Sequence, residues 1–491
     1  MKRILHWFRR DLRLCDNTAL SASCRDGDTV FPIFVLDPKL LESTDIGAPR
    51  VAFLLDALAS LRRSLEERGL PLLILHGEPR SVVPAIANDL EADAVFTNRD
   101  YSPYGRRRDA GVQAALGELG IGWRDFADLV LVEPWECVKD DGSPYTVFTP
   151  YARRWRQVAK SPPLRRPSMK PTTLPRQFRS VASSLPTLSS LGFSLHARII
   201  AGGEPQAARR LRRFVSSRLA RYRSDRNTPS LTGTSGISAD LKYGTLSSRQ
   251  IYATVARFVG EEHVDLDPSR SHLGMNREEK HRLQEAGAFV TELCWRDFYH
   301  SVLFHFPRVL RGPFRRQYEH MIWPEKRPEI IEAWTEGRTG FPIVDAGMRQ
   351  LNETGWMHNR LRMITASFLS KILLVDWRIG ERAFMQRLVD GDPAANNGGW
   401  QWSASTGTDA TPYFRIFNPL LQSKKFDPEG KYIRRWVPEL ADVEAPLIHE
   451  PARDPSTLAR TGYPPPCVDY QKRRAAALDL LRGVSRTNIA K

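Results

Sequence analysis

The sequence has few cysteines, and no pairing pattern links them. Its five cysteines, Cys15, Cys24, Cys137, Cys294 and Cys467, are odd in number, widely spaced and without a C-x-x-C motif. This spacing indicates neither a disulfide framework nor a zinc or iron–sulfur site. Reduced thiols are typical of cytosolic proteins, so we expect a soluble cytoplasmic protein without a bound metal.

Long apolar runs and the common nucleotide-binding loops are also absent. No segment is long and apolar enough to cross a membrane, and the first residues enter a predicted strand without the apolar core of a signal peptide. No G-x-G-x-x-G loop follows that strand, and no Walker A sequence occurs. Dinucleotide binding and nucleoside-triphosphate binding by those loops are therefore excluded. We find no internal repeat.

Positive charge is in excess. The 491 residues include 72 Lys and Arg against 56 Asp and Glu, which gives a formal net charge of +16. Such a charge favours a polyanionic partner such as nucleic acid, because each phosphate that is neutralised releases condensed counterions. A basic protein without such a partner would have the same composition.

The first 135 residues alternate strand and helix signals. Short β-rich runs occupy residues 4–8, 30–36, 72–75 and 94–97, and a helical pattern over residues 51–69 ends at Gly69. Repeated strand–helix units predict a parallel sheet covered by helices on both faces. We therefore expect an α/β domain over residues 1–135, Rossmann-like but without the dinucleotide fingerprint.

The remainder of the chain is predicted to be a linker followed by helices. Residues 160–191 are rich in proline and serine without an apolar period, which is typical of an extended connection. We expect an interdomain linker over residues 136–205 and an all-α domain over residues 206–485. In its first helix, Arg212, Arg213 and their arginine neighbours are predicted to form mostly a solvated face.

Residues 377–418 contain the most informative pattern. Paired carboxylates, paired amides and two indoles lie within thirteen residues: Asp390, Asp392, Asn396, Asn397, Trp400 and Trp402. Buried amides and carboxylates need partners and indoles offer stacking planes, so this segment is predicted to line a cavity. The two aspartates could also be a metal pair or a solvated turn, but no further metal ligands lie nearby in the sequence.

Several motifs occur in the order found in the photolyase and cryptochrome family. They are HWFRRDLRLCDN (6–17), YTVFTPYARRW (145–155), TELCWRDFY (291–299) and TGFPIVDAGMRQLNETGWMHNRLRMITASFL (339–369), followed by the segment 377–418. The chain resembles this family along nearly its whole length, and most closely the class I members that repair cyclobutane pyrimidine dimers. The resemblance implies an α/β domain followed by a helical domain that binds FAD.

The resemblance also implies which residues hold FAD. Residues 231–241 are rich in small residues and hydroxyls, and alone would predict only a helix cap or a weak anion site. The residues that match the family's phosphate-binding positions are Thr234, Ser235, Gly236, Ile237 and Ser238, with Tyr222 nearby. Those that match the ring-binding positions are Arg362, Asp390, Gly391, Asp392 and Asn396.

Within the ring-binding set, three expectations are specific. Asp390 should pair with Arg362, and Asp392 should lie against the flavin ring and ribose. Asn396 matches the position that faces flavin N5. An amide can hydrogen-bond the ring without readily supplying a proton, which points to fully reduced, anionic FAD as the working cofactor.

The lesion pocket is implied in the same way. Its matching residues are Glu292, Trp295, Asn359, Met363 and Trp402, while Arg226 and Arg360 are expected to contact phosphates. On composition alone these tryptophans would more often be core residues, Met363 a core residue and Asn359 a capping amide. If residues 355–363 are helical, Asn359, Arg362 and Met363 share a face and Arg360 turns aside.

Two further sets complete the prediction. Trp400, Trp377 and Trp323 match the family's electron-transfer chain, although their spacing in the sequence shows nothing by itself. Members that bind folate as an antenna chromophore have Glu where this chain has Gly105. The local string YSPYGRRRD resembles the deazaflavin-binding branch instead. We therefore expect an antenna of the deazaflavin or FMN type rather than folate.

The predicted function is light-driven repair of cyclobutane pyrimidine dimers in DNA by a monomeric enzyme. Members that repair (6-4) photoproducts have histidines at the positions of Asn359 and Met363, so that activity is not expected; His358 also occurs in dimer-repairing members. The alternatives are a cryptochrome-type photoreceptor, which usually has a long C-terminal extension that we do not expect here, and a flavin oxidoreductase that works in the dark.

Overall fold

The computed structural model describes residues 1–179, 185–260 and 276–487, with backbone alone for 485–487. Residues 180–184 of the predicted linker and residues 261–275 of the predicted helical domain lie outside the described part. The chain divides into two compact units. The first unit is Met1–Leu195, Ile200–Tyr222 and Ser235–Pro307, and the second is His196–Ile199, Arg223–Thr234 and Arg308–Lys491.

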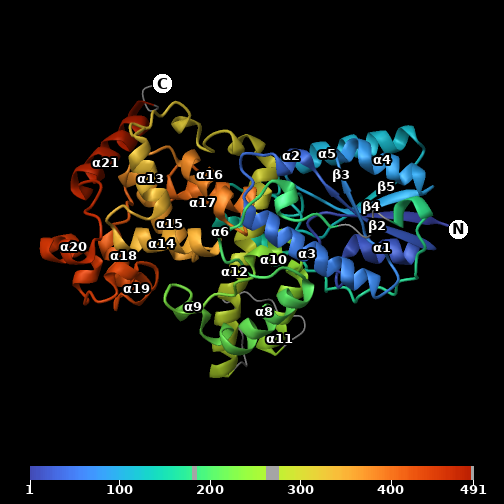
Figure 1. Ribbon diagram of the computed structural model, residues 1–491, viewed down its shortest axis with the longest axis horizontal. Helices are drawn as coiled ribbons and strands as arrows, with labels where there is room; N and C mark the ends of the chain where they lie inside the picture. Colours follow the sequence, from blue (N-terminus) through green and yellow to red (C-terminus); the bar gives the residue numbers. More distant parts are fainter. Residues whose placement is uncertain (180–184, 261–275, 488–491) are drawn as a thin grey trace. The chain divides into compact units, whose positions relative to one another are not determined.

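The first unit contains a five-stranded parallel sheet in the order β3-β2-β1-β4-β5. Its strands are β1 (Arg3–Phe8), β2 (Thr29–Leu36), β3 (Leu73–His76), β4 (Ala94–Asn98) and β5 (Gly122–Phe126). Leu5 in β1 pairs with Phe31 and Val95 on its two sides. Helices α4 and α5 lie on one face of the sheet and α1 and α3 on the other (Figure 1). The predicted parallel α/β arrangement is confirmed.

Four strands match the predicted runs within a residue or two, and β5 was missed. Inner strands such as β1 are buried along nearly their whole length and read as continuous apolar runs. Strand β5, GWRDF, is at the edge of the sheet and mostly exposed. An edge strand with polar residues lacks the apolar signal on which a prediction depends.

The helices of the first unit fall into two groups. The predicted helix over residues 51–69 is α3, which begins earlier because Pro49 suits a first helical turn. Gly69 adopts a positive φ of 72° in the turn that follows α3. Around the sheet lie α1 (Thr18–Asp26), α2 (Pro38–Leu41), α3 (Ala48–Glu66), α4 (Pro79–Asp89) and α5 (Pro103–Glu118). Beyond it follow α6 (Phe148–Gln157), α8 (Glu204–Ser217), α10 (Ser238–Tyr243), α11 (Ser248–Val259) and α12 (Arg277–His305).

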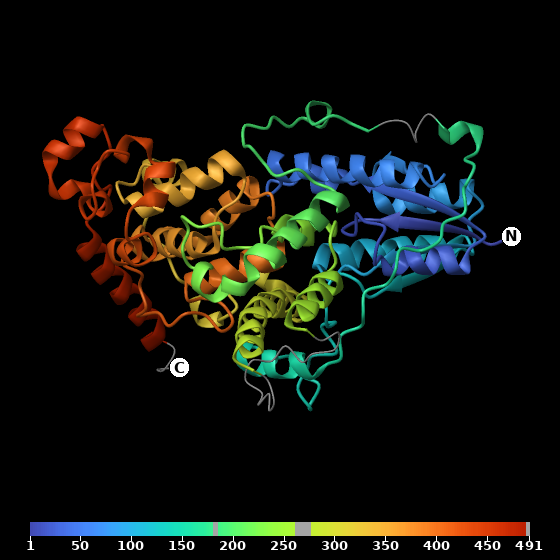
Figure 2. The same ribbon diagram turned by 90° about the horizontal axis from the view of Figure 1, so that it is seen from below.

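The long helix α12 is the support for part of the predicted lesion pocket. Asn276 caps it, and Glu279 completes a capping box that satisfies N–H groups at the helix start. Helix α6 packs against α12 (Figure 2). The described part of residues 160–191 has no regular structure apart from short turns such as η1 (Arg176–Phe178) and η2 (Ser189–Leu191).

The regular structure in the described residues of the second unit is helical. A large apolar cluster forms its core and includes Trp334, Leu361, Phe384 and Trp400. Its main helices are α13 (Pro328–Glu336), α14 (Pro342–Thr354), α15 (Asn359–Ser367), α16 (Trp377–Arg387), α17 (Pro393–Ser403), α18 (Pro419–Phe426), α19 (Lys431–Trp436), α20 (Pro455–Thr461) and α21 (Tyr470–Thr487). The short helix α9 (Tyr222–Asp225) spans the boundary of the two units.

Candidate functional site

The predicted ion pair between α15 and the start of α17 is present in the second unit. Arg362 Nη2 donates to Asp390 Oδ2 at 2.8 Å, and Arg362 Nε donates to the carbonyl oxygen of Met357 at 2.8 Å. Asp390 Oδ1 is buried and has no hydrogen-bond partner among the described protein residues. A buried carboxylate oxygen of this kind needs a donor, and a flavin ring supplies an N–H. The pair therefore fits a flavin.

Two adjacent amides near the start of α17 have different environments. Asn397 is buried: its Nδ2 donates to Val309 O and Glu381 Oε1, and its Oδ1 accepts from Gln401 Nε2 at 2.9 Å. Asn396 is half-buried and donates one bond, to Glu381 O at 3.0 Å. That bond fixes the amide plane of Asn396, while its Oδ1 and a second N–H are not engaged by Glu381.

Asp392 has a structural task alongside its predicted one. It is the N-cap of α17, with Oδ1 accepting from Ala394 N at 2.9 Å. Pro393 at the first helical position costs α17 no hydrogen bond, because a backbone N–H at this position would have no partner within the helix. The cap fixes the turn formed by Asp390, Gly391 and Asp392, and so fixes the positions of the two carboxylates.

The neighbourhood of His358 is strongly cationic. Burial, together with the charges of Arg360, Arg362 and Arg226, lowers the pKa of His358 to about 4. Burial, Arg226 and Arg415 also lower the pKa of Arg360. His358 is therefore neutral at physiological pH. The guanidinium groups that surround it form a positive surface suited to phosphates.

Helix α15 begins at Asn359, so residues 355–358 of the segment are not helical, and Arg360 is the exception to the predicted faces. Its side chain bends back, with Nη1 3.7 Å from the Met363 sulfur and Nη2 donating to Asn227 Oδ1 at 2.6 Å. The guanidinium also lies 4.4 Å from the centre of the Phe426 ring. A long arginine side chain can leave its own helical face in this way. Asn359 is exposed, and Met363 is half-buried.

The tryptophans of the predicted electron-transfer chain are buried in the second unit. Trp400, Trp377 and Trp323 are 2%, 2% and 8% exposed, and all three belong to the same apolar cluster. Trp400 also contacts Phe384 and Trp334, at ring-centre distances of 4.9 and 5.9 Å. The contact with Trp334 was not predicted, because the sequence separates the two by more than sixty residues without any repeat.

Glu292 and Trp295 lie three residues apart on α12 in the first unit, so they share one side of this helix. The Trp295 ring stacks on Phe148 of α6 with ring centres 3.5 Å apart and an angle of 5° between the planes. Phe148 thus covers one face of the indole and was missed by the sequence reasoning. Trp402, on α17 in the second unit, is half-buried.

Asp297 anchors the same helix. Its Oδ2 accepts from Leu131 N, Val132 N and Trp155 Nε1 at 2.9, 3.2 and 3.0 Å. Burial raises the pKa of Asp297 to about 6, although Arg296 and these hydrogen bonds oppose the shift.

The residues predicted to hold the FAD phosphates are divided between the two units. Tyr222 and residues 235–238 belong to the first unit, and Thr234 belongs to the second. Tyr222 is buried against Phe214 and Phe289, with ring centres 5.8 and 5.3 Å away. Gly236 adopts a positive φ of 68°, which favours glycine in this turn. Ser238 is the first residue of α10.

Comparison with known proteins identifies the family. The family model "FAD binding domain of DNA photolyase" matches residues 289–483, and the model "DNA photolyase" matches residues 4–170. Over 476 residues the chain is 42% identical to the deoxyribodipyrimidine photo-lyase of Synechococcus sp., an alignment that covers 96% of this chain and 94% of that protein. The chain belongs to the DNA photolyase family.

Solved structures of photolyases agree with this. A bacterial class III photolyase from Agrobacterium tumefaciens matches with a TM-score of 0.85 and 34% identity, over 99% of this chain and 98% of that one. An archaeal photolyase from Sulfolobus tokodaii, described as having two FAD molecules and a novel light-harvesting cofactor, matches with a TM-score of 0.82 and 33% identity over 98% and 100%. The predicted photolyase resemblance and two-part fold are confirmed.

The photolyase FAD-binding domain includes the ring-binding set but not the phosphate-binding string. Arg362, Asp390, Asp392 and Asn396 fall within residues 289–483, whereas residues 234–238 precede them. The chain therefore has an FAD-binding domain whose buried, unpaired carboxylate oxygen on Asp390 suits the ring. Among the described residues there is no cluster of three or more potential metal ligands and no helix long and apolar enough to cross a membrane.

A cavity lies at the carboxyl edge of the sheet, in the first unit. It has a volume of about 290 Å³ and is lined by Lys39, Glu78, Pro79, Arg80, Tyr104, Arg107 and Arg108. Asp37, directly after β2, accepts a hydrogen bond from the Tyr104 hydroxyl. Burial and this carboxylate raise the pKa of Tyr104. Ligands of open parallel sheets bind at this edge.

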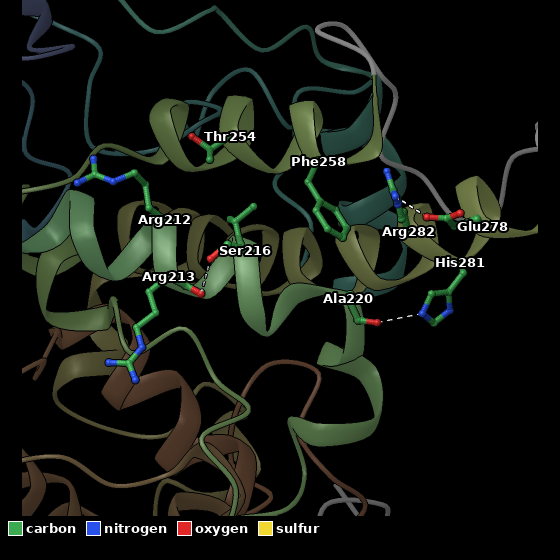
Figure 3. Close-up of a pocket in the computed structure, with 10 residues that line it drawn as sticks. Arg212, Arg213, Ser216, Ala220, Thr254, Phe258, Glu278, His281 and Arg282 are labelled. Carbon is green, nitrogen blue, oxygen red and sulfur yellow. Dashed lines mark hydrogen bonds and ion pairs between the residues drawn. The ribbon is translucent and has the colours of Figure 1, made fainter.

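A groove of about 710 Å³ between α8, α11 and α12 contains none of the predicted site residues among those that line it. Figure 3 shows Arg282 paired with Glu278 and the His281 ring directed at the carbonyl of Ala220. Arg212 and Arg213 extend from α8 in different directions. This arrangement is that of a solvated helical face, as predicted for the α8 arginines.

Proposed function

We propose that this chain is a deoxyribodipyrimidine photo-lyase, which repairs cyclobutane pyrimidine dimers in DNA with the energy of light. The observation that supports this most strongly is the 42% identity with a protein of that name over 96% of the chain. The Arg362–Asp390 pair and the neighbouring Asn396 add a local reason, because they form a polar surface within the FAD-binding domain.

When bound, reduced FAD would supply the dimer with one electron after absorbing light and would take it back once the ring has opened. The protein's own residues prepare this exchange. Asn396, held through Glu381 O, would offer the flavin a group that is a poor proton donor, which would favour the anionic form of the reduced ring. Arg362 and Asp390 orient the ring, and Tyr222 with residues 234–238 holds the phosphates.

The lesion is held by aromatic walls and one carboxyl group. Trp295 and Trp402 stack against the flipped bases, and Met363 gives an adaptable apolar contact. Glu292 hydrogen-bonds the base carbonyls, a contact that is worth most when negative charge develops on them. Photolyases are among the established examples of enzymes that act on a flipped base.

The damaged strand is positioned by cations. Arg226 and Arg360 contact phosphates and read no sequence. The low pKa of His358, about 4, supports a role without proton donation near pH 7. Repair of (6-4) photoproducts should be absent, because Asn359 and Met363 supply no imidazole for general acid catalysis.

The test is a repair assay with the full-length, FAD-loaded protein. Oligonucleotides that contain a cyclobutane thymine dimer or a (6-4) photoproduct are illuminated with the protein, with dark reactions as controls. We expect light-dependent loss of the cyclobutane dimer alone. Repair of the (6-4) lesion without dimer repair would refute the assignment, and an absence of any repair would favour a photoreceptor.

The cavity at the carboxyl edge of the sheet is our proposed site for an antenna chromophore of the deazaflavin or FMN type. Its four cations, Lys39, Arg80, Arg107 and Arg108, suit an acidic flavin-like ligand. Folate is disfavoured because Gly105 has no carboxylate where folate-binding members have Glu, and a Cβ there would lie 2.4 Å from Asp100 Cγ. Asp100 is held by Arg108 at 3.8 Å and Arg10 at 4.0 Å, so it cannot easily move aside for a glutamate.

Reconstitution tests the antenna proposal directly. Purified protein is mixed with FMN, a deazaflavin or methenyltetrahydrofolate, and bound chromophore is measured after gel filtration. A flavin-like chromophore should bind to the unmodified chain and bind less to Arg80→Ala. Stoichiometric folate binding would overturn the proposal.

A further inference from the structure

Trp334 is a fully buried tryptophan in contact with Trp400. It is 0% exposed and lies on α13, with its ring centre 5.9 Å from that of Trp400 and an angle of 73° between the planes. Phe384 of α16 touches both indoles, stacking on Trp334 at 6.0 Å and meeting the edge of Trp400 at 4.9 Å. The three rings form one contact cluster inside the second unit.

The indole N–H groups of Trp334 and Trp400 differ in their partners. Trp334 Nε1 donates to the carbonyl oxygen of Thr365 at 3.1 Å, close to the C-terminal end of α15. Trp400 Nε1 is buried and has no acceptor among the protein residues that the structure describes. A positive charge on an indole is stabilised when its N–H donates to a carbonyl. Trp334 therefore holds a positive charge more readily than Trp400 does.

We propose that Trp334 is a fourth redox-active tryptophan, a side branch that takes the positive charge from Trp400. The inference rests on the proposed role of Trp400 as an electron donor. When bound, oxidised and excited by light, the flavin would accept one electron from Trp400, which would become a radical cation. One electron then passes from Trp334 to Trp400, which returns to its neutral state while Trp334 becomes the radical cation. The Nε1 proton stays on Trp334, because an amide carbonyl is too weak a base to take it.

Burial decides what this side branch does. Trp334 is 0% exposed, so a reductant in solution cannot reach it, and the charge can leave only through its ring neighbours. The branch is therefore a reversible store that delays recombination of the separated charges. It competes with the outward route through Trp377 and Trp323, and its effect is clearest when that route is closed.

The experiment uses the full-length, FAD-loaded protein with Trp377→Phe, which closes the outward route. After a light flash, the decay of the indole radical is measured by transient absorption. The flavin and the tryptophan radical recombine only when the positive charge is on Trp400. The radical therefore lives longer in proportion to the equilibrium constant that favours the charge on Trp334. We expect the further change Trp334→Phe to shorten the lifetime by about tenfold, which corresponds to a preference of about 1.4 kcal/mol.

A matched control separates this role from general packing. Trp436, another buried tryptophan of the same apolar cluster, contacts Tyr432 instead. Trp436→Phe in the Trp377→Phe background should leave the lifetime unchanged. If the Trp334→Phe variant does not bind FAD, Trp334→Tyr also removes the indole. A buried phenol does not hold a positive charge without losing its proton.

Two outcomes would overturn the inference and can be told apart. An unchanged lifetime in Trp334→Phe removes Trp334 from the chain while the proposed role of Trp400 remains. An indole radical that persists in Trp400→Phe refutes the role of Trp400 itself, and with it the side branch. Dimer repair by chemically reduced protein should be unaffected by Trp334→Phe.

Discussion

Asn396 and Asn397 are adjacent amides with different tasks. Asn397 binds Val309, Glu381 and Gln401 and is buried, whereas the Asn396 side chain donates to Glu381 O and remains half-buried. One helical step of about 100° separates their directions. The residue proposed to face the flavin therefore depends on the orientation of α17 and not on the amide pair itself.

Trp402 is the residue at which the lesion model can be tested most simply. Trp402→Ala removes a stacking surface worth about 1 to 3 kcal/mol, so affinity for a dimer-containing oligonucleotide should fall by about tenfold or more. Affinity for undamaged duplex should hardly change, because it depends on charge. Titration of labelled oligonucleotides measures both, with Trp402→Phe as the control that keeps an aromatic plane. Unaltered dimer affinity in Trp402→Ala would contradict the stacking role.

Gly380 controls the position of Trp400. A Cβ at this residue would lie 2.1 Å from Trp400 Cη2 and 2.5 Å from Leu369 Cδ2, so α16 approaches α17 closely only because residue 380 is glycine. Gly380→Ala should therefore destabilise the protein by about 1 to 3 kcal/mol through overpacking. The thermal midpoint checks this. Gly483→Ala, where a Cβ meets nothing within 4 Å, should leave the midpoint unchanged or raise it.

At the scale of elements, α12 is held by α6 and by the loop after the sheet. Phe148 stacks on Trp295 from α6, and Asp297 binds Leu131, Val132 and the α6 residue Trp155. A helix that presents Glu292 and Trp295 to a substrate needs such support, because a loosely held site loses its geometry.

Removal of the Phe148 ring should affect substrate binding through Trp295. An aromatic pair contributes about 0.5 to 1.5 kcal/mol beyond the area it buries, so Phe148→Ala should weaken dimer binding by about two- to tenfold. Phe148→Tyr keeps the stacked ring and should bind as the unmodified chain does. Equal affinities for the alanine and tyrosine variants would show that Trp295 needs no support from α6.

Asp297 makes the stability of this region depend on pH. Its folded pKa of about 6 lies above the ordinary value of 3.8. Between pH 3.8 and about pH 6 the folded state therefore keeps a proton that the unfolded state has lost. Its contribution to stability is therefore complete below about pH 4 and is lost as pH rises through about 6. A shift of this size corresponds to about 3 kcal/mol at most.

Asp297→Asn should abolish that pH dependence. The amide oxygen can still accept from Leu131 N, Val132 N and Trp155 Nε1, but the side chain no longer ionises. The thermal midpoint of the variant, relative to that of the unmodified chain, should rise between pH 4 and pH 7. A difference that stays constant across this range would show that Asp297 remains ionised at low pH.

The whole molecule is a strong polycation, and its net charge of +16 should dominate binding to undamaged DNA. Each phosphate contact contributes about one to the slope of log K against log salt. Arg360→Ala should therefore reduce that slope by about one, on damaged and undamaged duplex alike. The control is Arg338→Ala, an exposed arginine that is paired with Glu332 and Glu336. Equal slopes for the two variants would argue against a phosphate contact by Arg360.

The sequence by itself determined the parallel sheet, the helical second part and the family. These depend on signals within short windows: apolar runs for the inner strands, a helical period for residues 51–69, and long ordered motifs such as residues 339–369. The resemblance also implied the Arg362–Asp390 pair, which the structure contains. The residues of the ring-binding set could thus be named before their geometry was known.

Only the tertiary structure decided which distant side chains meet. The edge strand β5 has too few apolar residues to be recognised, and it is a strand because β4 pairs with it. Phe148 and Trp295 lie far apart in the sequence, as do Trp334 and Trp400, and neither pair carries a local pattern. Helix packing brings these rings together, and packing depends on the shapes of whole surfaces rather than on any short run of residues.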